Sequence, residues 1–123
     1  MAKVNHFELS VENPKRAMKF YEKAFGWKFE KWGDQDYWLV KAGEKDEPGI
    51  NGAIQPRQKP GDTVVNTITV ADLDDTIKKI EKNGGKIVVP KMDIPKVGVM
   101  VYFMDTEGLV HGAMQVSPEG MMM

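Results

Sequence analysis

The sequence predicts an α+β domain made of two tandem modules, each with the element order strand, helix, strand, strand, strand. Eight segments are strand-like, with clear alternation of apolar and polar residues in VNHFELSV (4–11), and two others show the apolar spacing of an amphipathic helix. The chain also carries an internal repeat. NGAIQP (51–56) returns as HGAMQV (111–116), and SVENPKRAM (10–18) matches TVADLDDTI (69–77) in pattern. A plain ferredoxin-like sandwich is the alternative fold.

Module one is expected to span about residues 1–57. Its first strand, at 4–11, is followed by Asn13 and Pro14, a helix cap and a first-turn proline, and the predicted helix covers 14–25. Gly26 ends this helix. The remaining strands are expected at 27–32, 36–42 and about 50–56.

Module two is expected to span about residues 62–118. Asp72 or Asp74 can cap a helix at 73–83, and the strands are expected at 63–70, 86–90, 97–104 and 109–116. The tail, 119–123, ends in three methionines. Such an apolar tail gains little by standing in water, which favours its being covered by a second copy of the chain.

Composition excludes several classes of function. The chain has 123 residues, enough for one domain, and its net charge of −1 gives no basic excess for binding nucleic acid. It has no cysteine, which excludes disulfides, thiolate nucleophiles and cysteine-based zinc sites. The N-terminus resembles no signal peptide, and no apolar run is long enough for a membrane span. We therefore expect a cytoplasmic protein with no nucleic-acid or membrane partner.

Two segments resemble a known family. VNHFEL followed by NPKRAMKFYEKAFGW is similar to the first module of the glyoxalase/bleomycin-resistance/dioxygenase (vicinal oxygen chelate) superfamily. GVMVYFMDTEGLVHGAMQ resembles the closing hairpin of that superfamily. The resemblance implies that the two modules form a curved eight-stranded sheet around a shared cup, with the helices on its outer face. It also implies a small-molecule ligand and a homodimer.

The resemblance also implies where a metal would be bound. In metal-using members each module gives one ligand from its first strand and one from its last. These positions fall on His6 and Gly52 in module one, and on Val65 and Gly112 in module two. Only His6 carries a donor, and Glu8, on the same strand face, could add a carboxylate. We therefore predict no metal cofactor, with a divalent metal at these two residues as the alternative.

The same strand geometry predicts which side chains face the cup. Counting back from Asp105 places Met100 and Tyr102 of module two on the face of Gly112. The same arrangement in module one places Trp38 on the cup face. Mostly apolar walls with a few polar groups are typical of a small-molecule pocket. The alternative is that these side chains fill the cup as core, and His111 is expected to face away. The candidate pocket residues are His6, Glu8, Trp38, Thr67, Met100 and Tyr102.

Three functions are consistent with this residue set. The first is a metal-independent protein that binds an aromatic or largely apolar small molecule. The second is a glyoxalase-like lyase or isomerase acting on a vicinal-oxygen substrate, with His6 and Glu8 binding its metal. The third is an interaction module whose cup is packed shut. The sequence assigns no catalytic residue.

Overall fold

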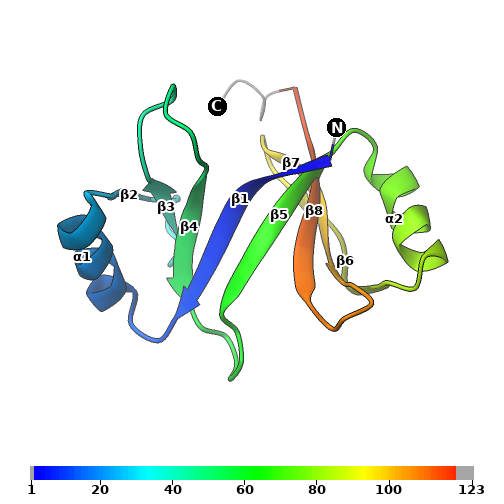
Figure 1. The fold of residues 1–123 in the computed structure, drawn as a ribbon, viewed down its shortest axis with the longest axis horizontal. Coiled ribbons are helices and arrows are strands. Elements are labelled where there is room, and N and C mark those ends of the chain that lie inside the picture. Colours follow the sequence, from blue (N-terminus) through cyan, green and yellow to red (C-terminus); the bar gives the residue numbers. More distant parts are fainter. Residues whose placement is uncertain (1, 119–123) are drawn as a thin grey trace. The chain divides into compact units, whose positions relative to one another are not determined.

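A computed structural model describes residues 2–118, so the methionine tail lies outside the described residues (Figure 1). The element order strand, helix, strand, strand, strand occurs twice, which confirms the predicted modules. The elements are β1 (Ala2–Val11), α1 (Pro14–Phe25), β2 (Lys28–Lys31), β3 (Trp38–Lys41), β4 (Asn51–Pro56), β5 (Val64–Val70), α2 (Leu73–Lys82), β6 (Lys86–Ile94), β7 (Gly98–Met104) and β8 (Val110–Val116).

The chain divides into two compact units, which we call the first unit (residues 5–65) and the second unit (residues 66–118 with 2–4). In the first unit the strand order is β2-β3-β4-β1, and in the second it is β5-β8-β7-β6. The pairs β1–β4 and β5–β8 are parallel, and the other pairs within each unit are antiparallel. Eight strands in mixed pairing and two helices confirm the predicted α+β class.

The helices begin where the sequence predicts. The side chain of Asn13 accepts a hydrogen bond from the backbone nitrogen of Arg16 at 3.0 Å, and Gly26 ends α1 with a positive φ of 74°. Of the two candidate caps for α2, it is Asp72 that accepts from a backbone nitrogen of the first turn, at 3.0 Å. Neither helix of the described chain has the length and apolar character needed to cross a membrane.

The first unit has a sheet with two different faces, which decides where its site lies. Pairing places Phe7, Gly52 and Val40 side by side on one face, which we call the Phe7 face. There the ring of Phe7 lies 5.7 Å from that of Trp27, which stacks on Tyr21 of α1. The opposite face, the His6 face, carries His6, Glu8, Asn51, Ala53, Leu39, Glu30, Lys28 and Lys41.

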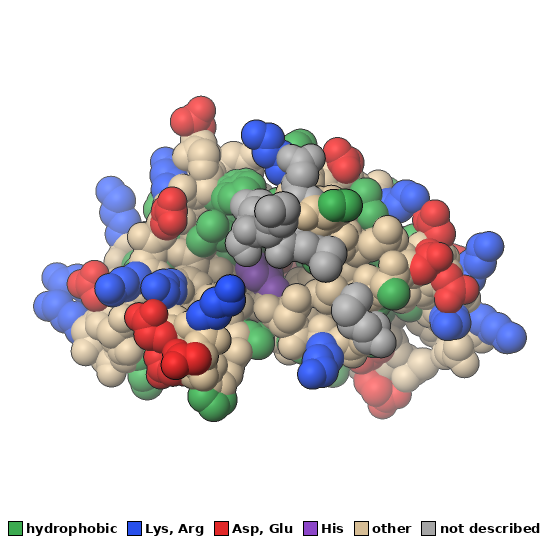
Figure 2. All heavy atoms as spheres, turned by 90° about the horizontal axis from the view of Figure 1, so that it is seen from above, with side chains coloured by type: hydrophobic (Ala, Val, Ile, Leu, Met, Phe, Trp, Pro, Cys, Tyr) green, Lys and Arg blue, Asp and Glu red, His purple; other side chains and the backbone are tan. Residues whose placement is uncertain are grey.

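The second unit has its core between α2 and the strands. Val70, Leu73, Val101 and Ala113 are buried there, and further apolar residues pack around them. One element differs from expectation: β6 continues past Pro90 to Ile94, because proline is tolerated in an edge strand with irregular pairing. On the face of the molecule shown in Figure 2, acidic and basic side chains are interspersed, as a net charge of −1 suggests.

Candidate functional site

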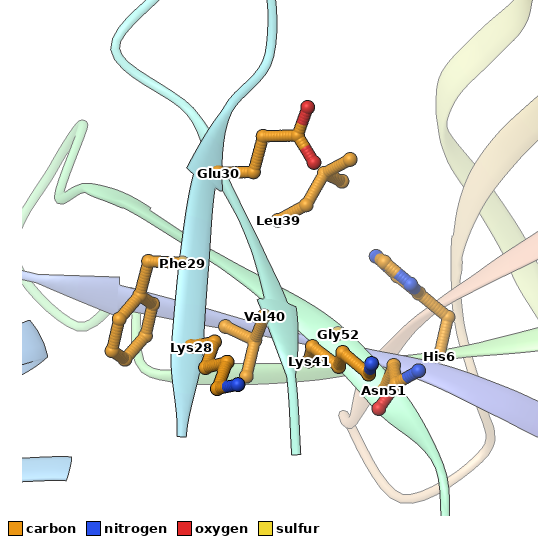
Figure 3. Close-up of a pocket in the computed structure, with 9 residues that line it drawn as sticks. All are labelled: His6, Lys28, Phe29, Glu30, Leu39, Val40, Lys41, Asn51 and Gly52. Atoms are coloured by element: carbon orange, nitrogen blue, oxygen red, sulfur yellow. The ribbon is translucent and has the colours of Figure 1, made fainter. Parts of the chain in front are cut away.

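The His6 face of the first unit carries an open groove of about 520 Å³. Strands β1, β2, β3 and β4 all contribute to its walls, so the groove belongs to the sheet and not to a mobile loop. Figure 3 shows the side chains of His6, Leu39 and Glu30 on its upper part. The lining residues are His6, Lys28, Phe29, Glu30, Leu39, Val40, Lys41, Asn51 and Gly52.

A chain of hydrogen bonds joins His6, Tyr37 and Glu8. The phenol of Tyr37 donates to Oε2 of Glu8 at 2.7 Å, and Nε2 of His6 lies 3.3 Å from the same phenol oxygen. Because the phenol has one hydrogen, which is given to the carboxylate, Nε2 of His6 is assigned as the donor to Tyr37. Glu8 is only 7% exposed, so these bonds stabilise a carboxylate that has lost most of its water.

Burial also sets the charge of the histidine. Desolvation lowers the pKa of His6, and the nearby carboxylate of Glu8 opposes this shift without cancelling it. Burial therefore favours the neutral imidazole, and in that form Nε2–H donates to Tyr37. A neutral histidine, a phenol and a buried carboxylate in one chain can donate, accept and relay a proton to a bound molecule.

Acid should destabilise the protein through His6. Its pKa is lowered in the folded state, so the unfolded chain binds the proton first as the pH falls below the ordinary value of about 6.5. We expect the free energy of unfolding to fall between pH 7 and pH 5, and His6→Gln to flatten that fall. Urea denaturation across this range measures it, with His111→Gln as the matched control. An unchanged slope in His6→Gln would contradict the assignment.

The structure brings together two of the predicted pocket residues, His6 and Glu8, and adds Tyr37, which the sequence analysis missed. It places Trp38 on the other side of the sheet. Trp38 pairs with Ile54, which pairs with Leu9, so all three lie on the Phe7 face. The side chains of β3 therefore alternate between the two faces one residue out of step with the prediction. The alternation of Tyr37 with Leu39 and Lys41 is the sequence signal that could have indicated it.

The other predicted pocket residues lie together in the second unit. Thr67 and Tyr102 both pair with Gly112, from the strands on its two sides. A Cβ at Gly112 would lie 3.0 Å from Oγ1 of Thr67 and 3.1 Å from Cε of Met100. These residues thus share one face of β5, β8 and β7, and Thr67 and Met100 are buried there. The cup shared by both modules stays a prediction.

The residues at the family's metal positions do not fit a metal centre. Gly52 lies on the Phe7 face, where an added Cβ would overlap the carbonyl oxygen of Phe7 and lie 2.6 Å from its ring. The residue of β4 that faces His6 is Asn51, whose side-chain oxygen already accepts from the backbone nitrogen of Ala42 at 2.9 Å. Within residues 2–118 no three histidine, aspartate or glutamate side chains form a group able to hold a metal ion.

Comparison with known proteins gives one family. A family model described as the Glyoxalase/Bleomycin resistance protein/Dioxygenase superfamily matches residues 3–110. A "Glyoxylase-like domain-containing protein" of Didymella fabae is 31% identical over 114 residues, which cover 88% of this chain and 89% of that protein.

Solved structures share the fold over almost the whole chain. A hypothetical protein from Bacillus halodurans has a TM-score of 0.70 at 13% identity, covering 94% of this chain and 95% of its own. A methylmalonyl-CoA epimerase in complex with methylmalonyl-CoA and NH4+ has a TM-score of 0.71 at 12% identity, covering 96% of both chains. At such low identity these likenesses establish the α+β fold of the two modules and nothing of the chemistry.

Proposed function

Because the chain belongs to the glyoxalase/bleomycin resistance/dioxygenase superfamily, we propose that it binds a small molecule without a metal ion, in the groove on the His6 face of its first unit. The observation that carries this proposal is the hydrogen-bonded chain of His6, Tyr37 and Glu8. The one histidine at a family metal position uses Nε2 as a donor to a phenol, which leaves a lone pair on Nδ1 alone, and the other three family positions, Gly52, Val65 and Gly112, carry no side-chain donor. In the hydrogen-bonded chain His6 lines the groove, and Tyr37 and Glu8 support it, so His6 is the polar group that meets a ligand.

The ligand we propose has an aromatic or largely apolar body and one polar end. Leu39 lies between the polar residues of the groove wall, so an apolar body can cover it while a polar group reaches His6 (Figure 3). The competing function, a metal-dependent lyase or isomerase, needs a third donor beside His6 and Glu8. No step of that chemistry follows from the described residues.

The test is a fragment titration followed by NMR on protein treated with EDTA. Small aromatic probes such as phenol and indole should shift the backbone amide signals of the groove, with the same affinity before and after Zn²⁺ or Ni²⁺ is added. Tyr37→Phe should weaken binding of phenol about threefold to tenfold through loss of one hydrogen bond. Tyr21→Phe, on α1, is the matched control. Binding that needs the added metal, or no binding by any probe, would overturn the proposal.

We also propose a homodimer, as the family resemblance suggests. Helix α1 has no buried residue, and Phe20 and Phe25 are 59% and 65% exposed. Neighbouring exposed aromatic side chains support an interface between protein chains, because a monomer gains nothing by keeping them in water. Light scattering over a dilution series tests this, and a monomer mass at tens of micromolar would contradict it.

A further inference from the structure

We propose that the groove takes a ligand bearing an oxyanion, a carboxylate or a phosphate, held between Lys28 and Lys41. This inference rests on the proposed function and adds the chemical class of the ligand. The two lysines are direct partners across β2 and β3, and both line the groove on the His6 face. Direct partners have Cβ atoms about 5 Å apart, so two ammonium groups can reach one anion.

The charges around these lysines leave room for an anion. Like charges directly opposite each other in a sheet are destabilising, and Lys28 lies directly opposite Lys41. The backbone pairing of β2 with β3 does not depend on either side chain being a lysine. Lys41 has a carboxylate of Glu44 at 3.6 Å, but both side chains are more than half exposed, so this ion pair contributes little. In the described part of the chain Lys28 has no carboxylate within the 4.0 Å of an ion pair.

A further donor lies at the same end of the groove. The side-chain oxygen of Asn51 accepts from the nitrogen of Ala42, so its amide NH2 supplies donors for an anion. The one acidic side chain that lines the groove on β2, Glu30, pairs with Leu39 and lies at the opposite end from the lysines (Figure 3). The groove thus has its cationic donors and Asn51 at one end, with His6 next to Asn51 on the adjacent strand, and Leu39 and Glu30 further along β3 and β2.

This order of groups matches a ligand of a definite kind. Its oxyanion would lie between Lys28 and Lys41, its apolar body against Leu39, and its far end within reach of the His6 and Tyr37 hydrogen-bonding groups. Each exposed lysine alone would contribute little, as with Glu44, but an anion between Lys28 and Lys41 would accept charged hydrogen bonds from both ammonium groups at once, which makes it the main polar contribution to affinity. Binding should also weaken with salt, because the lysines are exposed.

The experiment compares benzoate, phenyl phosphate and the neutral benzamide by NMR titration of the whole chain at low salt. One of the two anions should bind the groove at least about tenfold more tightly than benzamide, and the better one identifies carboxylate or phosphate. Lys28→Gln and Lys41→Gln should each weaken that anion about fivefold to tenfold and leave benzamide unchanged. Lys28→Arg should keep the affinity.

Lys31→Gln is the matched control. Lys31 lies on the same strand as Lys28 but pairs with Trp38 on the Phe7 face, so its replacement should leave the affinity for all three probes unchanged. Equal affinity for benzoate, phenyl phosphate and benzamide would overturn the oxyanion site and leave the proposed function standing. The same conclusion follows if Lys28→Gln and Lys41→Gln, shown to be folded by their melting curves, keep full affinity for the anions. Absence of binding by all three probes would contradict both proposals.

Discussion

Replacement of Gly52 by alanine should lower the free energy of unfolding by about 2–3 kcal/mol, the upper range for overpacking a well-packed site. A Cβ at this position would overlap the backbone carbonyl oxygen of Phe7 and lie 2.6 Å and 2.7 Å from two atoms of its ring. The carbonyl cannot move aside without breaking the pairing of β1 with β4, and the ring is packed against Trp27. Urea denaturation should show a lower midpoint at an unchanged m-value.

Gly43→Ala is the matched control for this prediction. A Cβ there would meet only the exposed side chain of Glu47, whose Oε1 would lie at 3.2 Å and accepts one hydrogen bond, from the backbone nitrogen of Glu44 at 2.7 Å. A shift of a few tenths of an ångström by this side-chain end relieves the contact. Its cost should be within about 0.5 kcal/mol, as for other surface substitutions. If Gly52→Ala were as stable as Gly43→Ala, the Phe7 ring and β1 would be looser than the structure shows. The expected result would also show that Gly52 cannot be replaced by a residue with a metal-binding side chain.

Local signals made most of the fold predictable. Asn13, Pro14 and Gly26 set the ends of α1 through hydrogen bonds and backbone conformations that depend on a few adjacent residues. The repeat then predicted the second module. The sequence could not distinguish Asp72 from Asp74 as the cap of α2, because both lie at the start of the helical pattern. The structure identifies Asp72, whose backbone is extended as that of a cap is.

The site was less predictable, because it depends on strand register. The repeat equates Gly52 with Gly112 and Glu8 with Thr67, and Thr67 does pair with Gly112. In the first unit, however, it is Phe7 that pairs with Gly52, so the two modules differ by one residue. A shift of one residue moves every side chain to the other face.

The same limit explains the absence of Tyr37 from the predicted site. Two adjacent aromatic residues, Tyr37 just before β3 and Trp38 at its first position, could each face His6 from the sequence alone. Trp38 is the more apolar, and it is paired with Ile54 on the Phe7 face. Tyr37 takes the face where its hydroxyl reaches Glu8. A buried carboxylate needs a donor, so the pairing of Glu8 with a nearby phenol is a physical criterion that periodicity alone does not contain.

The bond between Tyr37 and Glu8 should be the strongest polar interaction of the site. Tyr37→Phe should cost about 2 kcal/mol of unfolding free energy, since a hydrogen bond to a charged group contributes more than a neutral one. The loss removes a donor from a carboxylate that is 7% exposed and bonded at 2.7 Å. Tyr21→Phe should cost much less, because the ring of Tyr21 stacks on Trp27 and keeps that contact.

A double-mutant cycle separates the bond from the general effects of each substitution. In a Glu8→Gln background the phenol still has an acceptor, but a neutral one, so Tyr37→Phe should cost only about 1 kcal/mol there. The difference, about 1 kcal/mol, is the coupling that the charge adds. Urea denaturation of the wild type, the two single variants and the double variant at pH 7 measures all four corners. Equal costs in both backgrounds would show that the charge of Glu8 adds nothing to the bond, which would contradict its being the strongest polar interaction of the site.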